Sequence, residues 1–160
     1  MLLKNLIKDI ELEISGDDVY LDLNTASMIK DAILHIIQNS AEHGIEKEGL
    51  IKIDLSDSDG KIGITVSDNG SGIDPEVIYK KSLEKGLIKQ EDSGNLNLDE
   101  KLYLIFLPGF STKEVATEFS GRGVGLDVVK NNIEKLEGSV KIESSLGKGT
   151  TFHLSVPLKS

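Results

Sequence analysis

One predicted helix carries a stripe of polar side chains whose types could support ligand binding or catalysis. In the segment HIIQNSAEHGIE, at about 100° per residue, four of them fall within roughly a quarter of the helix circumference: His35, Asn39, Glu42 and His43. The apolar residues of this helix cluster on the other side: Ile29, Ala32, Ile33, Ile36 and Ile37. Lys and Glu would suffice for a face that only meets water, so two imidazoles and a carboxamide in line indicate a ligand site. A solvated face or a pair of core histidines is the structural alternative.

A second candidate lies in the segment VSDNGSGID, residues 66–74. Alternating apolar residues predict a strand that ends at Asp68, and Gly70 and Gly72 follow it. Glycines at such a place let the backbone approach a flat ligand closely. The Asn-Gly pair also favours a β-hairpin. However, the next residues predict a helix instead of a returning strand, which favours the ligand site.

A third candidate is the segment SGRGVGLDVVK, where Gly121, Gly123 and Gly125 lead into a predicted helix. Free backbone N–H groups and the positive end of a helix dipole suit a phosphate. The dinucleotide-binding fingerprint needs G-x-G-x-x-G directly after a strand, whereas here G-x-G-x-G follows a polar stretch. The GKGT at 147–150 lacks the order of a P-loop. The glycines therefore predict a phosphate site of another type.

The spacing of possible metal ligands gives weaker evidence for a site than the three segments above. His35 and His43 are not at the i, i+4 spacing of a helical zinc pair, and no acidic residue completes such a site. A hard cation held by one carboxamide oxygen and by phosphates fits better, because Mg²⁺ usually keeps several waters and few protein ligands. Asn39 is the candidate ligand for that ion.

The elements that must position these residues follow from periodicity and turn residues. Strands are expected as three hairpins: 11–15 with 19–23, 50–56 with 61–67, and 139–144 with 151–157. Helices are expected at about 25–43 (capped by Asn24 or Thr25), 75–85, 99–106 and 124–136, with a mobile loop at 89–97. This order predicts an α+β two-layer sandwich, with a mixed, mainly antiparallel sheet covered on one face by helices.

Composition limits the function classes. The chain has 160 residues, 38% of them hydrophobic, which suits a single domain over residues 1–160. It has no cysteine, so disulfides, Cys-based zinc sites and a Cys nucleophile are excluded. The net charge of −9 argues against a nucleic-acid partner. The segment MLLKNLIKDIELEIS has no apolar run that would make a signal peptide or membrane span, so a cytoplasmic location without membrane insertion is expected.

An acidic chain that binds an anion must concentrate its cations locally. Its middle segment offers candidates for this: Lys80, Lys81, Lys85, Lys113 and Arg122. These residues either surround a bound anion or are ordinary solvated charges.

Taken in order, the motifs resemble those of the ATP-binding (Bergerat-type) fold shared by gyrase, Hsp90, the MutL proteins and histidine kinases. The resemblance rests on Asn39 in a helix, D-x-G-x-G at 68–72, the glycines at 121–125 and G-x-G-T at 147–150. Within this superfamily the chain is similar to the catalytic ATP-binding domain of CheA-type chemotaxis histidine kinases over roughly residues 10–158. The phrases that carry this likeness include IFLPGFSTKEVATEFSGRGVGLDVVKNNIEKLEG and GKGTTFHLSVPL. Gln38, Glu42 and Leu107 depart from the family pattern of Arg, Asp and Glu.

The resemblance implies roles for individual residues. Asn39 would hold Mg²⁺ between the phosphates, and His35 and His43 would line the triphosphate and ribose. Asp68 would accept the exocyclic N–H of adenine beside Thr150. The other implied ATP contacts are Gly70, Gly72, Ile73, Lys81, Ser111, Lys113, Gly121, Arg122, Gly123, Val124, Gly125 and Leu126. His35, Asn39 and Lys113 would act in catalysis, and residues 74–120 would form a mobile lid over the nucleotide.

The implied activity is that of an ATP- and Mg²⁺-dependent protein histidine kinase domain. Besides His35 and His43, the chain has only His153, which alternates along a predicted strand. The phosphoacceptor histidine is therefore expected on a separate domain or protein, with a response regulator downstream and the isolated domain monomeric. Two alternatives remain open: an ATP-binding switch module without phosphotransfer, and an anti-sigma-type serine kinase on the same fold. The lid phrase PGFSTKE favours the CheA type.

Overall fold

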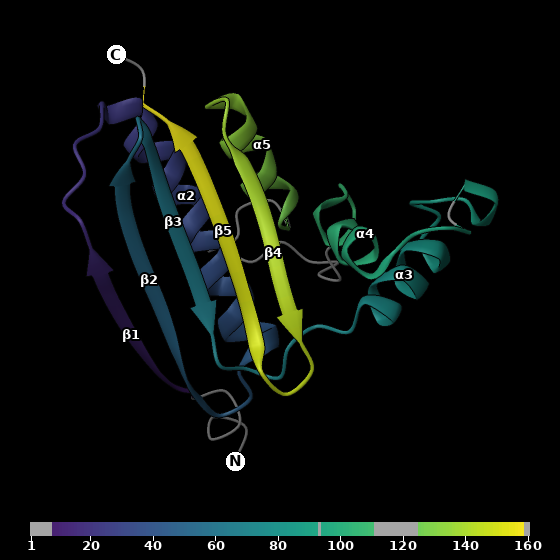
Figure 1. Cartoon of the computed structure of the whole chain (residues 1–160). Coiled ribbons are helices and arrows are strands. Elements are labelled where there is room, and N and C mark those ends of the chain that lie inside the picture. Colours follow the sequence, from purple (N-terminus) through teal and green to yellow (C-terminus); the bar gives the residue numbers. More distant parts are fainter. Residues whose placement is uncertain (1–7, 93, 111–124, 159–160) are drawn as a thin grey trace.

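In the described part of the chain, five strands form one mixed sheet in the order β1-β2-β3-β5-β4 (Figure 1). They are β1 (Asp9–Gly16), β2 (Glu48–Ser58), β3 (Lys61–Asp68), β4 (Ser139–Ser145) and β5 (Gly149–Pro157). β1 pairs with β2 in parallel, and the other neighbours pair antiparallel. The computed structural model describes residues 8–92, 94–110 and 125–158. The predicted mixed, mainly antiparallel sheet is confirmed.

The predicted first hairpin is wrong. Residues 19–23 form no strand, and β1 instead pairs with β2, which lies beyond a helix in the chain. The reason lies at Asp22, whose carboxylate accepts hydrogen bonds from the N–H and the hydroxyl of Thr25, both at 2.8 Å. Asp22 thereby caps a helix that begins at Leu23, so neither Asn24 nor Thr25 is the cap. Val19 and Leu21 pack against the core from a loop, which explains their apolar alternation.

The second predicted hairpin is confirmed. β2 and β3 pair from Ile51 opposite Asp68 to Ser58 opposite Lys61. The turn between them has φ of +54° at Asp59 and +73° at Gly60. Positive φ at both central residues is the geometry of the type I′ turn, whose twist matches that of the flanking strands.

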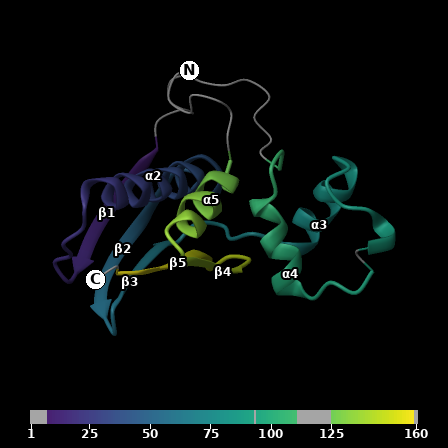
Figure 2. The same ribbon diagram turned by 90° about the horizontal axis from the view of Figure 1, so that it is seen from above.

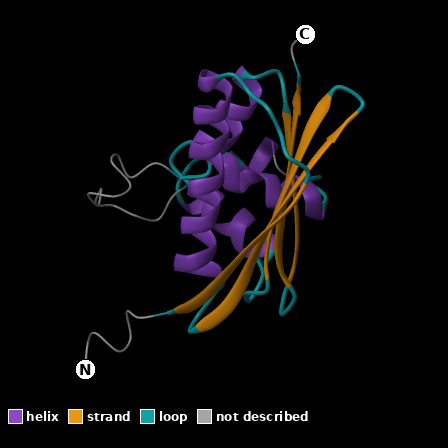
Figure 3. Cartoon of the chain, turned by 90° about the vertical axis from the view of Figure 1, so that its left-hand side faces the viewer, coloured by secondary structure: helices purple, strands orange, loops and turns teal. Residues whose placement is uncertain are grey.

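Helices cover one face of the sheet. They are α2 (Leu23–Asn39), the π-helix η1 (Ser40–Gly44), α3 (Pro75–Glu84), η2 (Gln90–Asp92), α4 (Leu98–Tyr103), η3 (Leu104–Phe106) and α5 (Asp127–Lys135). α2 and α5 lie along one face of the sheet (Figure 3). α3 and α4 lie side by side beyond β4 (Figures 1 and 2). The predicted two-layer α+β sandwich is confirmed, although α5 begins at Asp127 instead of 124.

The core fills the space between the sheet and the helices α2 and α5. Its most buried members alternate along the strands, as in Ile62, Ile64 and Val66 of β3, and face Ala32 and Ile36 of α2. Within the described part of the chain, no helix combines the length and apolar character needed to cross a membrane.

Candidate functional site

A cavity of about 340 Å³ opens where the C-terminal end of α2 meets the ends of β3 and β5. This volume is within the usual range for a small-molecule site. Predicted site residues that line it are Asn39, His43, Asp68, Gly72, Ile73, Lys81, Gly125, Leu126 and Thr150. The fold therefore brings together residues from five separate segments of the chain.

Some predicted residues do not line the cavity. His35 lies half-buried on α2, one turn before Asn39, and Gly70 lies beside Asp68. The predicted contacts Ser111, Lys113, Gly121, Arg122, Gly123 and Val124 fall outside the described residues. Their roles, and that of His35, remain predictions.

The central polar group of the cavity is the Asp68 carboxylate at the end of β3. Asp68 continues the inward face of Ile64 and Val66, and the antiparallel register places it directly opposite Thr150 of β5. Its Oδ2 accepts a hydrogen bond from Ser40 Oγ at 2.7 Å, and its Oδ1 accepts one from the N–H of Gly70 at 2.9 Å. A carboxylate is an acceptor only, so its remaining lone pairs suit a ligand that presents N–H groups.

The hydroxyl of Ser144 fixes the hydroxyl of Thr150. Ser144 Oγ accepts a hydrogen bond from the N–H of Ile73 at 2.8 Å and lies 2.8 Å from Thr150 Oγ1. Thr150 is 6% exposed, so its hydroxyl is held at the cavity wall by Ser144. Ser144 was not among the residues predicted from the sequence. The register of the β4–β5 hairpin, which pairs Ser144 with Thr150, is the signal that points to it.

The polar stripe of the helix has a different geometry from the one predicted. Regular α-helix ends at Asn39, and η1 follows as a π-helical turn in which the N–H of Ile45 bonds to Ser40 O at 2.8 Å, five residues back. Ser40 lies four residues after Ile36 on the buried face of α2 and is itself buried, whereas Glu42 and His43 in the π-turn are exposed. Single π-turns inside helices often mark functional sites.

The glycines after Asp68 serve the protein backbone as well as the cavity. A Cβ at Gly70 would lie 2.1 Å from Gly44 O, and a Cβ at Gly72 would lie 2.1 Å from Ser145 O. Gly72 also has φ of +79°, which side chains rarely allow. These glycines let the loop after β3 contact η1 on one side and the turn after β4 on the other. The sequence predicted only their approach to a ligand.

Apolar residues from the helices complete the cavity wall. These residues were not predicted from the sequence. They are Val77 and Ile78 of α3, Ile105 of η3, Phe110, and Leu146 in the turn before β5. Asp74, Ser40 and Gly44 were missed as well. An apolar slot with a few fixed polar groups suits a flat, partly polar molecule such as a purine base.

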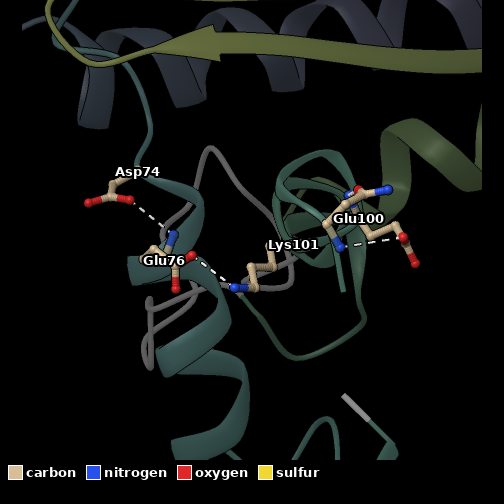
Figure 4. A network of polar contacts seen from close by, with 5 residues as sticks. Asp74, Glu76, Glu100 and Lys101 are labelled. Atoms are coloured by element: carbon tan, nitrogen blue, oxygen red, sulfur yellow. Dashed lines mark hydrogen bonds and ion pairs between the residues drawn. The ribbon is translucent and has the colours of Figure 1, made fainter. Parts of the chain in front are cut away.

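α3 carries charges of both signs at the cavity. Asp74 caps the helix by accepting the N–H of Glu76 at 2.9 Å (Figure 4). Among the described lining residues, Lys81 is the one Lys or Arg. The position of Lys81 on the helix that leads away from Asp68 suits a ligand with a base at one end and an anionic group at the other.

A clip of polar contacts joins α3 to α4. Lys101 Nζ of α4 lies 2.8 Å from Glu76 Oε1 of α3 (Figure 4). It also lies 4.8 Å from the ring centroid of Tyr79 of α3. Asn97 and Glu100 form a capping box at the start of α4. The two helices therefore form one unit at the mouth of the cavity.

A resident metal ion would find a neutral oxygen ligand here. Across residues 8–92, 94–110 and 125–158, no group of three or more His, Cys, Asp and Glu side chains could hold a metal ion. The carboxamide oxygen of Asn39 lines the cavity and is a neutral oxygen ligand. This donor set fits a hard cation that takes its other ligands from phosphates and water.

Comparisons with known proteins give a consistent result. The model of the family described as "Histidine kinase-, DNA gyrase B-, and HSP90-like ATPase" matches residues 24–160. The chain is 42% identical to the sensor histidine kinase CheAY of Helicobacter pylori, over 98% of this chain and 21% of that protein. It is also 42% identical to the chemotaxis protein CheA of Borreliella burgdorferi, over 98% of this chain and 19% of that protein. The chain thus spans about a fifth of the length of these curated relatives.

Solved structures agree with the fold. The catalytic domain of the histidine kinase ThkA, in a nucleotide-free form, is 25% identical and superposes with a TM-score of 0.58. That match covers 92% of this chain and 78% of the ThkA domain.

Proposed function

The chain belongs to the histidine kinase-, DNA gyrase B- and HSP90-like ATPase family, and we propose that it binds Mg-ATP and transfers the terminal phosphate to a histidine on a separate domain or protein. The observation that carries the proposal is the cavity in which Asp68 and Thr150 face each other, with Asn39 and Lys81 on its walls. The 42% identity to chemotaxis kinases supports the CheA type over the other members of the family. We place its action in the cytoplasm, within a chemotaxis or two-component signalling system.

Adenine binds in the apolar slot. The exocyclic amino group donates to Asp68, and the Thr150 hydroxyl bonds to the base beside it. Guanine carries a carbonyl oxygen at the position of that amino group, and an oxygen facing the carboxylate would leave both acceptors without a donor. Asp68 thereby selects ATP over GTP.

The phosphates extend from the base toward Asn39 and Lys81. Asn39 offers its carboxamide oxygen to Mg²⁺, and Lys81 neutralises part of the phosphate charge. Lys113, Arg122 and the glycines from Gly121 onward, which lie outside the described residues except for Gly125, are proposed to contact the terminal phosphates. When bound, Mg²⁺ supplies charge neutralisation on the triphosphate.

The chemical step itself needs little covalent participation by this chain. A ring nitrogen of the acceptor histidine bonds to the terminal phosphorus while the bond from that phosphorus to the oxygen it shares with ADP breaks. ADP leaves with the electron pair, and the histidine ring loses its N–H proton to solvent. The chain contributes position and electrostatic stabilisation, which dominate phosphoryl transfer.

Incubation with labelled ATP tests the proposal. A histidine-containing acceptor domain of a chemotaxis kinase, produced separately, should become labelled only when the chain and Mg²⁺ are present. The label should be lost in acid and retained in base, as expected for phosphohistidine. An acid-stable label would indicate a serine kinase instead, and ATP binding without any label on the acceptor would indicate a switch module.

A further inference from the structure

We propose that Ser40 is a positioning residue, whose hydroxyl orients the Asp68 carboxylate so that the cavity accepts a 6-amino purine. This inference rests on the proposed nucleotide binding and adds a specificity determinant to it. Ser40 lines the same cavity as Asp68 and is only 3% exposed.

The two oxygens of Asp68 are held by donors from different segments. Ser40 Oγ donates to Oδ2 at 2.7 Å from η1, and the N–H of Gly70 donates to Oδ1 at 2.9 Å from the loop after β3. Two donors on two oxygens fix the rotation of the carboxylate plane about its terminal bond. With the Gly70 contact alone, that rotation is broad, as for any carboxylate. Ser40 therefore decides where the free lone pairs of Asp68 point.

The backbone of Ser40 is itself immobilised. Its N–H bonds to the carbonyls of Ile36 and Ile37, and its carbonyl accepts the N–H of Ile45. The end of α2 on one side and the π-turn on the other thus anchor the backbone from which the Ser40 hydroxyl projects.

The donor and acceptor groups of the Ser40 hydroxyl explain the expected preference for a 6-amino purine. A hydroxyl has one proton, and that proton is used on Asp68. Toward the cavity Ser40 presents lone pairs only, as Asp68 does. The pair therefore forms an acceptor-only surface, which favours an amino group and penalises a carbonyl oxygen.

The test compares two nucleotides that differ only at the position Asp68 would contact. Calorimetry measures the affinity of the chain for ADP and for purine riboside diphosphate, which lacks the 6-amino group. Wild-type protein should prefer ADP. Ser40→Ala should weaken ADP binding by roughly tenfold, the effect of losing one hydrogen bond to a charged group, and leave the affinity for the analogue unchanged.

Two further variants serve as controls for this test. Ser40→Thr keeps the hydroxyl and should keep the preference for ADP. Ser82→Ala is the matched control, because Ser82 is a fully buried serine that donates to Ile78 O of its own helix and does not line the cavity. It should leave the ratio of the two affinities unchanged.

Three results would overturn the inference. An equal loss of affinity for both nucleotides in Ser40→Ala would show a structural role only. An unchanged ratio in a folded Ser40→Ala variant, or a ratio lost in a folded Ser40→Thr variant, would remove the hydroxyl from specificity. Failure of the wild-type chain to bind either nucleotide would instead contradict the proposed function itself.

Discussion

At the scale of single residues, Asp68 combines a structural contact with a place at the proposed nucleotide site. It joins the end of β3 to η1 through Ser40 and also faces the cavity. Removing its charge therefore affects two sets of partners at once.

Asp68→Asn should reduce ATP affinity about ten- to hundredfold. The new amide donor would face either the amino group of adenine or one of the two protein donors, and an unsatisfied buried donor costs about 1–3 kcal/mol. Calorimetry with Mg-ATP measures the change. Asp54→Asn is the control, because Asp54 is exposed on β2 and its carboxylate accepts from Ser15 Oγ. Equal ATP affinity in Asp68→Asn and the parent would contradict the site.

Asn39→Ala should reduce the Mg²⁺ dependence of ATP binding while the fold is kept. Asn39 is half-buried at the cavity and its side chain lies off the apolar face of α2. Titration of ATP with and without Mg²⁺ should show a smaller gain from the metal in the variant than in the parent. Gln38→Ala serves as the neighbouring control outside the cavity lining. A variant with the parental gain from Mg²⁺ would rule out Asn39 as its ligand.

At the scale of elements, the start of α2 depends on one exposed carboxylate. Hydrogen bonds from the N–H and then the hydroxyl of Thr25 hold the pKa of Asp22 below its ordinary value. A lowered pKa in the folded state means that the contribution to stability is complete at neutral pH and is lost as pH falls through that lowered pKa.

Asp22→Ala should therefore lower Tm by a few degrees near pH 7, with a difference from the parent that shrinks in acid. Asp22→Asn keeps a capping oxygen and should recover most of the Tm at pH 7, without that pH dependence. Thermal unfolding at pH 7 and at pH 3–4 gives both comparisons. A Tm difference between Asp22→Ala and the parent that stays constant across this pH range would show that the charge of Asp22 contributes nothing to stability.

The elements also show which parts of the structure could be predicted. Strands 50–56 and 61–67 and the helix from Asp74-Pro75 were predictable because local turn and capping residues determine them. The parallel pairing of β1 was not, because Val19 and Leu21 alternate like a strand while their burial comes from packing against distant residues. Ser40 escaped prediction for a different reason. It continues the buried face of α2 four residues after Ile36, but a serine at that place carries no hydrophobic signal in the sequence.

At the scale of the whole molecule, α3 and α4 lie to one side of the sheet (Figure 1), and α3 and η3 carry part of the cavity wall. Their polar clip holds them together, so they can move as a unit when a nucleotide is bound. This is the described part of the lid predicted for residues 74–120.

Hydrogen exchange should detect that movement. Amides of residues 94–110 should be protected more by a non-hydrolysable ATP analogue with Mg²⁺ than by ADP, and least without nucleotide, since the terminal phosphate adds contacts for the cations of the lid. Amides of β1, at the far edge of the sheet, are the internal control. Equal protection of residues 94–110 in all three states would mean that this segment is fixed scaffold.

The tight turn at Asp59 and Gly60 also has a consequence for the order in which the chain folds. The β2–β3 hairpin closes through the shortest turn of the sheet, two residues against three for β4–β5, whereas β1 reaches β2 only across α2, and β3 reaches β5 across the whole middle of the chain. Loop-closure entropy favours local pairings early, so this hairpin is the expected folding nucleus.

The folding and unfolding rates of the Gly60→Ala variant test this order of strand pairing. Gly60 has open space around it, so a methyl group there adds only the strain of its positive φ, about 1 kcal/mol. We expect that strain to slow folding about fivefold and to leave the unfolding rate nearly unchanged. Ile10→Ala on β1 should do the reverse and mainly accelerate unfolding. In this chain, the strand that comes first in the sequence would then be among the last to join the sheet.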